Sequence, residues 1–178
     1  MFNLKSLLPS LLLILLMASC VRAQDVPQRL QTGYDPLDEK LEKLVTADER
    51  AISAKEAKQL TNAVFLDARE QEEYTVSHLP GARHLGYDDL NLSVVDDVKK
   101  SRPIVVYCTV GYRRVRAAKK LRKAGFSQVY NLFGSLYAWK LAGFPLEDKN
   151  GQPTNRLHTY NKKWGSFVPE NIGEKVWE

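Results

Sequence analysis

Short apolar runs rich in β-branched and aromatic residues recur along this 178-residue chain, and longer, more polar stretches separate them. Short segments of this kind are too short for helices but typical of strands, and I-V-V-Y at 104–107 has the unbroken apolar character of a buried one. We predict strands at residues 63–67, 82–85, 104–108 and 129–132. A chain of this length is enough for one domain with a sizeable core and too short for two of ordinary size.

The segment ahead of the first predicted strand divides into two parts. Residues 24–36 are mostly polar and contain Pro27, Gly33 and Pro36, which is typical of a linker. The apolar positions that follow have the i, i+4, i+7, i+8 spacing of an amphipathic helix, namely Leu37, Leu41, Leu44 and Val45. We interpret residues 24–49 as a linker and an N-terminal amphipathic helix that packs outside the main domain.

Helical segments alternate with the predicted strands. Ser53 and Glu56 have the spacing of a capping box, which predicts a helix that begins there and runs to about Leu60. Further helical or turn segments are expected at residues 70–75, at 88–100 and from about 112 onward. This alternation predicts an α/β fold in which helices cover both faces of a parallel sheet. In such sheets the site lies at the carboxyl ends of the strands, where Asp67 and Cys108 both fall.

The two ends of the chain differ from this pattern. Residues 148–178 lack clear periodicity but contain Trp164, Phe167 and Trp177, so we expect a C-terminal tail that packs on the domain, and a patch for a partner is the alternative. Residues 1–23 have the layout of a bacterial-type secretory signal, with Lys5 before an apolar run at 7–17 and small or polar residues after it. That run is short for a membrane-spanning helix, and a retained anchor is the alternative.

Two cleavage sites are open for this leader. Cleavage after V-R-A at 21–23 would release a soluble exported protein. M-A-S-C at 17–20 resembles a lipobox, which would leave a lipoprotein anchored at Cys20. In either case we expect an exported protein of the periplasm or cell envelope.

The cysteine count bears on function. Because Cys20 is removed or acylated, Cys108 is left as the only free thiol, and an internal disulfide is excluded. We interpret Cys108 as a working cysteine that must pass any group it carries to another molecule. No Cys/His cluster has metal-site spacing, and we expect neither a metal nor a cofactor.

The segment I-V-V-Y-C-T-V-G-Y-R-R at 104–114 carries the candidate chemistry. The strand delivers Cys108 to a tight loop around Gly111, just before a helix N-terminus. Converging amides, the helix dipole and the charges of Arg113 and Arg114 each favour the thiolate. Cys108 is thus predicted to be a nucleophile for a group that arrives on an anion, and the alternative is an inert buried cysteine.

Several motifs, in order, resemble the rhodanese (sulfurtransferase) homology domain over about residues 50–147. They are F-L-D-A-R-E at 65–70, E-Y-T-V-S-H-L-P-G-A at 73–82, the Cys108 loop with glycine at +3 and arginine at +5, V-Y-N-L at 129–132 and A-G-F-P-L at 142–146. Ser77 stands where the family usually has glycine. The resemblance implies a rhodanese-like parallel β-sheet flanked by helices on both faces.

The resemblance also implies roles for individual residues. Cys108 would take a sulfane sulfur from an anionic donor, thiosulfate-like or a persulfide, and pass it as a persulfide to a thiol or cyanide acceptor. The loop and anion site would consist of Thr109, Val110, Gly111, Tyr112, Arg113 and Arg114. Asp67 and Arg69 would form an internal pair that supports the loop, and His78 would be structural.

Two other functions stay open. Arg114 stands six residues after Cys108, so the segment also has the Cys-x5-Arg spacing of protein tyrosine phosphatases. Gly111 and Arg113 follow the sulfurtransferase spacing, and Tyr107 occupies the place of a usual phosphatase histidine, although the family more often has Ser or Thr at 114. Sulfurtransferase is favoured over a Cys-dependent phosphatase or arsenate-handling enzyme. A non-catalytic rhodanese-like binding module is the third hypothesis.

The charge distribution suggests partners. The chain has 26 Lys and Arg against 21 Asp and Glu, and without Lys5 and Arg22 of the leader the net charge is +3. The excess is concentrated at residues 113–123, which hold seven basic and no acidic side chains. Such a run is usually a solvated helix face, and otherwise it draws sulfur-bearing anions or an acidic protein partner. Nucleic acid is not an expected partner, because aromatic residues do not interleave with the run.

Overall fold

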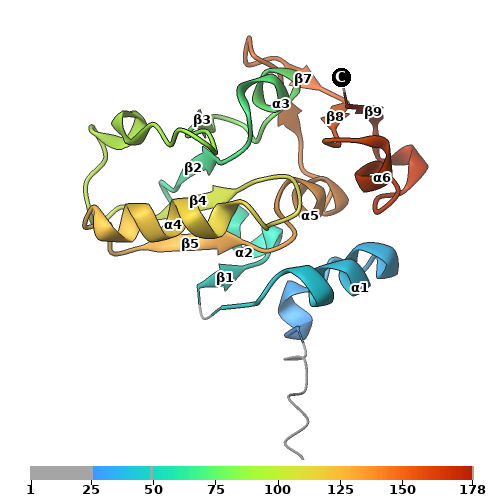
Figure 1. Cartoon of the computed structure of the whole chain (residues 1–178), viewed down its shortest axis with the longest axis horizontal. Helices are drawn as coiled ribbons and strands as arrows, with labels where there is room; N and C mark the ends of the chain where they lie inside the picture. Colours follow the sequence, from blue (N-terminus) through green and yellow to red (C-terminus); the bar gives the residue numbers. More distant parts are fainter. Residues whose placement is uncertain (1–25, 49, 178) are drawn as a thin grey trace, which may run out of the picture.

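In the computed structural model, which describes residues 26–48 and 50–177, a five-stranded parallel sheet forms the centre of the molecule (Figure 1). Its strand order is β1-β5-β4-β2-β3, and every neighbouring pair is parallel. The strands are β1 (Ala51–Ile52), β2 (Val64–Asp67), β3 (Arg83–His84), β4 (Ile104–Tyr107) and β5 (Val129–Leu132). The four predicted strands are present, whereas β1, with only two residues, is too short to show in the hydrophobic pattern. The predicted leader, with Cys20, lies outside the described residues.

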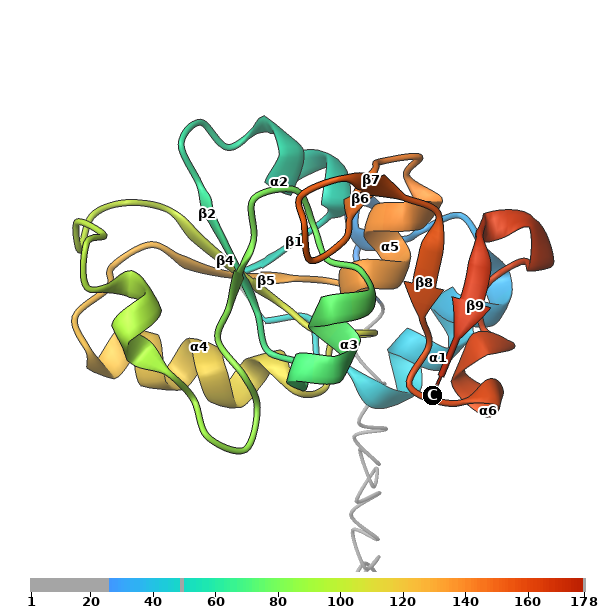
Figure 2. The ribbon, with the colours of Figure 1, turned by 90° about the horizontal axis from the view of Figure 1, so that it is seen from above.

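Helices cover both faces of this sheet, as the fold prediction required (Figure 2). Alternate residues of β4 point to opposite sides, so Val105 packs in one apolar cluster and Val106 in the other. The first cluster receives α1 (Asp35–Leu44), α2 (Ala54–Gln59) and α5 (Ser135–Leu141). The second receives α4 (Arg114–Lys123) and a 3-10 helix, η2 (Leu92–Val95).

The helix starts follow local sequence signals. At α2, Ser53 Oγ accepts the Glu56 amide hydrogen and the Glu56 carboxylate accepts from Ser53 N, which is the predicted capping box. A second capping box, between Glu70 and Glu73, starts α3 (Gln71–Val76) one residue later than expected. This box fixes Glu73 in the first turn of α3, directly after the carboxyl end of β2.

The segment interpreted as a linker is packed rather than free. Val26 and Leu30 are buried, and a short 3-10 helix, η1 (Gln28–Leu30), places Leu30 in the first apolar cluster. Leu37 and Leu41 of α1 are fully buried in the same cluster. The polar composition of residues 24–36 hid this, because the segment is anchored by few apolar side chains and by polar contacts such as the hydrogen bond from Arg29 Nη1 to Ala51 O at 3.0 Å.

The C-terminal residues fold back onto the domain. A two-stranded antiparallel pair, β6 (Leu146–Glu147) and β7 (Pro153–Thr154), precedes a parallel pair of β8 (Arg156–His158) and β9 (Glu174–Val176). Between β8 and β9 lie α6 (Lys162–Gly165) and the 3-10 helix η3 (Glu170–Ile172). Lys40 of α1 lies 5.3 Å from the Trp164 ring, so α1 and α6 occupy the same flank (Figures 1 and 2).

Within residues 26–48 and 50–177, no helix combines the length and the apolar character that a membrane crossing demands.

Candidate active site

Cys108 follows the last residue of β4 and is only 1% exposed. Its Sγ accepts the amide hydrogen of Gly111 at 3.1 Å, which closes the loop over the sulfur. Gly111 has φ +127°, a region that other residues rarely adopt, and a Cβ there would lie 3.3 Å from Arg114 Nε, closer than usual. The backbone conformation of the loop therefore favours glycine at this position.

A serine that the sequence did not single out lies behind the sulfur. Ser135 Oγ accepts the Cys108 amide hydrogen at 3.1 Å and lies 4.0 Å from Sγ. The first free amides of α5 donate to the carbonyls of the loop, Leu136 N to Cys108 O and Tyr137 N to Thr109 O. The start of α5 therefore fixes the backbone that carries Cys108.

The helix after the loop begins at Arg114, two residues later than expected, because the segment up to Arg113 forms bends and a turn around the sulfur. Arg113 itself is held by Glu73 of α3. Its Nη1 lies 2.5 Å from Glu73 Oε2 and its Nη2 2.8 Å from Oε1. Thr109 Oγ1 also donates to Glu73 Oε1 at 3.1 Å and accepts from Arg113 Nη2 at 2.9 Å.

Glu73 is ionised despite its burial. Burial alone would raise the pKa of Glu73, but hydrogen bonds and charge from Arg113, together with the charge of Arg69, lower it below 4.5. His158 of β8 brings its Nδ1 within 3.7 Å of Glu73 Oε1. Burial lowers the pKa of His158, against the attraction of Glu73, and its Nδ1 accepts the Tyr160 amide hydrogen at 3.2 Å. Both observations assign a neutral imidazole.

The two arginines after the loop lie in different surroundings. Arg113 lines the cavity in front of Cys108, whereas Arg114 is fully buried beneath the loop. Arg114 Nε donates to Leu132 O at 3.0 Å, and its two terminal nitrogens have no hydrogen-bond partner among the described residues. Burial lowers the pKa of Arg114, and electrostatic interactions with Cys108 and Asp48 oppose this effect.

The ion pair predicted between Asp67 and Arg69 is present at the end of β2. Arg69 Nη2 lies 2.7 Å from Asp67 Oδ2, and both side chains are fully buried. Arg69 Nη2 also donates to Ser77 O, which ties the end of α3 to the strand. Ser77 has φ −167°, an extended conformation open to any residue, so the chain tolerates serine at the family's glycine position. His78 stacks on Tyr74, a packing role.

A cavity of about 560 Å³ opens in front of Cys108. Its inner wall is the loop after β4, formed by Cys108, Thr109, Val110 and Arg113. Its outer wall is apolar and comes from the two ends of the chain, formed by Leu44, Tyr160 and Trp164. The remaining lining residues form its rim, namely Glu70, Tyr87, Asp88 and Tyr112. Sequence reasoning missed the outer wall, because no motif marks it.

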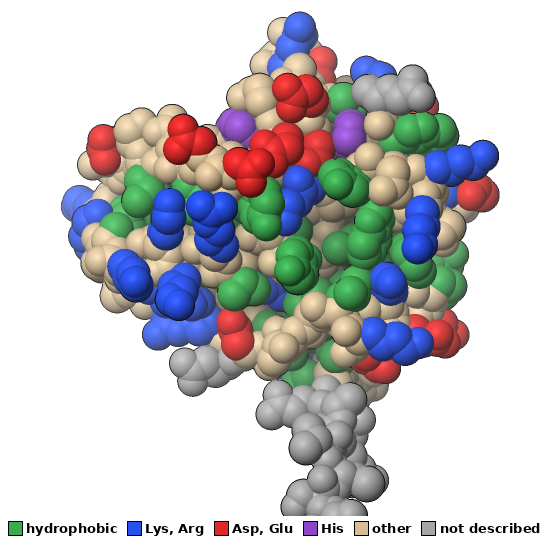
Figure 3. All heavy atoms as spheres, in the orientation of Figure 1, with side chains coloured by type: hydrophobic (Ala, Val, Ile, Leu, Met, Phe, Trp, Pro, Cys, Tyr) green, Lys and Arg blue, Asp and Glu red, His purple; other side chains and the backbone are tan. Residues whose placement is uncertain are grey.

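Charges of opposite sign flank this cavity. Figure 3 shows hydrophobic side chains around its position, acidic side chains above them and a row of Lys and Arg to the left, over α4. The exposed basic residues of α4 are Arg116, Lys119, Lys120, Arg122 and Lys123. Arg116 also donates to the carbonyls of Tyr87 and Asp88, which holds the rim against the helix.

No group of three or more His, Cys, Asp or Glu in the described part of the chain could hold a metal ion.

Comparison with known proteins places this geometry in a family. The model of the rhodanese-like domain matches residues 50–142, just over half of the chain. The thiosulfate sulfurtransferase GlpE of Coxiella burnetii is 34% identical over 87 residues, which are 49% of this chain and 79% of that protein. The protein of the same name from Ectopseudomonas mendocina is 33% identical over 104 residues, covering 57% of this chain and 94% of the relative.

Solved structures agree with this assignment. The solution structure of the rhodanese-like domain of the Anabaena sp. Alr3790 protein superposes with a TM-score of 0.51 at 32% identity, covering 57% of this chain and 80% of that one. The crystal structure of a thiosulfate sulfurtransferase from Pseudomonas aeruginosa also has a TM-score of 0.51, at 27% identity, covering 68% of this chain but only 23% of that one.

Proposed function

Because this chain belongs to the rhodanese-like domain family, we propose that it is a sulfurtransferase in which Cys108 carries the moving sulfur. The donor is a small anion of the thiosulfate type or a persulfide, and the acceptor is a thiol or cyanide. One observation carries the proposal: the Cys108 sulfur accepts the Gly111 amide hydrogen at the inner end of a cavity that Arg113 also lines. Relatives named thiosulfate sulfurtransferase support the same reaction class.

In the first step, the Cys108 thiolate attacks the outer sulfur of thiosulfate. A bond forms between Sγ and that sulfur, the sulfur–sulfur bond of thiosulfate breaks, and its electron pair leaves with sulfite. Cys108 then carries a persulfide with a negatively charged terminal sulfur. Amides of the 109–113 loop and the nearby guanidinium of Arg113 stabilise that charge, as an oxyanion hole stabilises an oxygen.

In the second step, the persulfide takes up a proton from solvent, and the acceptor thiolate attacks its outer sulfur. A new sulfur–sulfur bond forms, the bond to Sγ breaks, and its electron pair restores the Cys108 thiolate. The proton stays on the outer sulfur of the product persulfide. Division into two steps predicts ping-pong kinetics.

The phosphatase and arsenate alternatives need Arg114, six residues after Cys108, to meet the substrate. Arg114 is fully buried and bonded to Leu132 O, and it does not line the cavity, whereas Arg113 does. This arrangement supports the sulfurtransferase spacing over the phosphatase spacing.

The test is a steady-state assay of the full chain with thiosulfate and a thiol acceptor, each varied against the other. Transfer through Cys108 predicts parallel double-reciprocal lines. Cys108→Ser is expected to reduce turnover to background, whereas Cys20→Ser, the matched change at the other cysteine, leaves it unchanged. Turnover that survives in Cys108→Ser would overturn the proposal. So would Cys108-dependent hydrolysis of an aryl phosphate in a protein that moves no sulfur.

We also propose that the protein works outside the cytoplasm, on the support of the leader pattern alone. Cell fractionation followed by sequencing of the mature N-terminus tests this. A start at Gln24 indicates free release, and a blocked, membrane-bound product that starts at Cys20 indicates a lipoprotein. A cytoplasmic protein that still begins with Met1 contradicts export.

A further inference from the structure

The outer wall of the cavity lies outside the part of the chain that matches the family. The family model covers residues 50–142, whereas Leu44 precedes it and Tyr160 and Trp164 follow it. Lys40 of α1 sits over the Trp164 ring at 5.3 Å, so the two flanking segments support each other. These segments add an apolar surface in front of Cys108 that the matched domain does not supply.

Tyr160 is held toward the cavity at a conformational cost. Its φ is +67°, in the left-handed region that a bulky residue seldom adopts, and its side chain is 54% exposed. Two hydrogen bonds fix the turn, from Tyr160 N to His158 Nδ1 and from Thr159 N to Val176 O. A large, exposed aromatic ring that is carried on a strained backbone and lines the same cavity as Cys108 indicates a binding surface.

The positive charge in the cavity is already shared. Arg113 is the only cation among the described residues that line it, and both of its terminal nitrogens contact Glu73. The Arg113 guanidinium also lies between two aromatic rings, 5.8 Å from Tyr87 and 5.6 Å from Tyr160. A donor anion beside Cys108 can interact with Arg113 alongside Glu73. The described lining residues offer no second cation for another anionic ligand.

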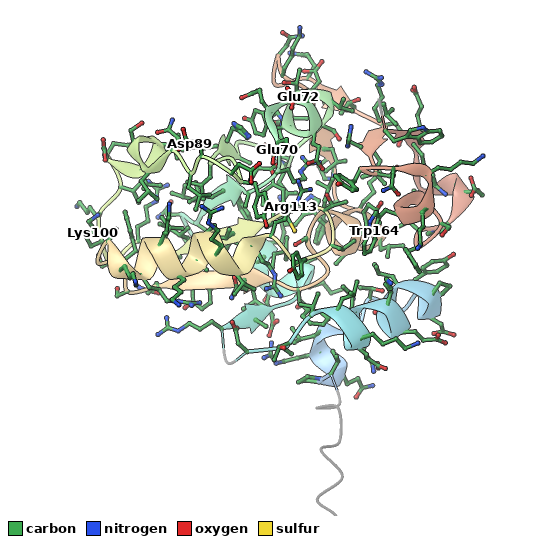
Figure 4. The ribbon with its side chains drawn as sticks, viewed as in Figure 1. Glu70, Glu72, Asp89, Lys100, Arg113 and Trp164 are labelled. Carbon is green, nitrogen blue, oxygen red and sulfur yellow. The ribbon has the colours of Figure 1, made fainter. Side chains whose placement is uncertain are left out.

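The rim carries two carboxylates. Glu70 and Asp88 line the cavity, and Arg116, the cation beside them, donates to the backbone carbonyls of Tyr87 and Asp88 rather than to either carboxylate. In Figure 4, Glu70 and Glu72 lie above Arg113, while Trp164 lies to its right. A ligand that extends from Cys108 toward the opening therefore passes between acidic side chains and aromatic rings.

From this juxtaposition we infer that the sulfur acceptor is a small thiol with an apolar body of about aromatic size and no negative charge. The inference rests on the proposed function. The acceptor body lies against Tyr160 and Trp164, while its sulfur reaches the persulfide on Cys108 and reacts by the second step given above. Thiosulfate needs only the inner end, beside Gly111 and Arg113. A cavity of about 560 Å³ has room for such a molecule.

The test separates loading from discharge. The full chain is loaded with thiosulfate, and intact mass establishes the persulfide. It is then mixed with four thiols: benzyl mercaptan, its para-carboxylate, 2-mercaptoethanol and 2-mercaptoethanesulfonate. Tyr160→Gly removes the ring and suits the left-handed backbone, so it is not expected to disturb folding. Trp164→Ala removes the second ring, and Trp177→Ala is the matched control on an exposed tryptophan that does not line the cavity.

The readout is the ratio of wild-type to variant discharge rate for each thiol, in which the intrinsic reactivity of the thiol cancels. For benzyl mercaptan we expect the wild type to discharge about ten times faster than the double variant Tyr160→Gly, Trp164→Ala. The expected ratio is about three for the single variant Tyr160→Gly. For the other three thiols and for Trp177→Ala it stays near one. Ratios that are equal for all four thiols, or largest for an anionic thiol, would overturn the inference. Failure to load at all would instead overturn the proposed function.

Discussion

The inner and outer walls of the cavity are built in different ways. The inner wall stands on fully buried polar contacts: the Asp67–Arg69 ion pair at the end of β2, and Ser135 behind Cys108. The outer wall consists of the partly exposed residues Leu44, Tyr160 and Trp164, carried by α1 and by the C-terminal segment on either side of the part that matches the family. The difference suggests that reactivity is set where strand ends and helix starts are rigid, and that selectivity is added from outside the shared fold.

The largest expected effect compares the loss of a buried carboxylate near the Cys108 loop with the loss of an exposed one on the C-terminal segment that carries Tyr160 and Trp164. Asp67→Asn leaves the fully buried Arg69 without a counter-charge and should lower the free energy of unfolding by about 3–5 kcal/mol. Glu170→Gln removes a 93% exposed carboxylate that pairs with Lys175 in the C-terminal segment and should cost less than about 1 kcal/mol. Urea denaturation measures both. Similar losses would mean that the two walls do not differ in this way.

A smaller effect sharpens the contrast within the inner wall. Arg113→Met removes the cation in the cavity and leaves Glu73 without its ion-pair partner. Loading of Cys108 by thiosulfate should therefore slow at least tenfold, because a charge-assisted contact worth about 1.5–3 kcal/mol is lost. Single-turnover loading rates provide the measurement.

Arg114→Met is the matched control for this change. It keeps the buried stem and removes a guanidinium whose terminal nitrogens have no partner among the described residues. Leu132 O loses the bond from Arg114 Nε but still accepts from Ser135 Oγ at 3.2 Å. It should slow loading less than Arg113→Met does, without lowering the free energy of unfolding. The reverse order of loading rates would favour the phosphatase spacing.

The smallest effect is the pH dependence of stability at Glu73 and His158, where the two walls meet. Burial lowers the pKa of His158 below 6.5, and Arg113 lowers that of Glu73 below 4.5 against the effect of burial. For both groups the unfolded chain binds more protons as pH falls, so the free energy of unfolding decreases on acidification. The His158 contribution is lost first, below 6.5, and that of Glu73 below 4.5.

Urea denaturation over a pH series separates these two contributions. His158→Asn should flatten the upper part of the curve, and Glu73→Gln the lower part. A wild-type protein that gains stability on acidification would contradict both assignments.

Local patterns explain which features were predictable from the sequence. The strands, the Cys108 loop and the Asp67–Arg69 pair depend on residues close together in the chain, so spacing alone indicates them. Glu73 reaches Arg113 across 40 positions, and Ser135 reaches Cys108 across 27. Such contacts can be predicted only once the order of the strands in the sheet is known. Tyr160 carries no motif, because its role depends on how the C-terminal segment folds back.

Some boundaries also differed for physical reasons. Helix α4 begins late because the loop must first turn around Sγ, as the φ of +127° at Gly111 shows. The supposed linker is packed because buried Val26 and Leu30, together with hydrogen bonds from Arg29 and Thr32, anchor it. Polar composition is therefore a poor guide to a segment held by a few apolar side chains and by hydrogen bonds.

The most direct test of the account is the mass of the protein after incubation with thiosulfate, followed by mapping of the modified peptide. The account predicts a gain of one sulfur atom on the peptide that contains Cys108, and its loss when a thiol acceptor is added. A folded protein whose Cys108 reacts with iodoacetamide but gains no sulfur from thiosulfate or from a small persulfide would contradict it.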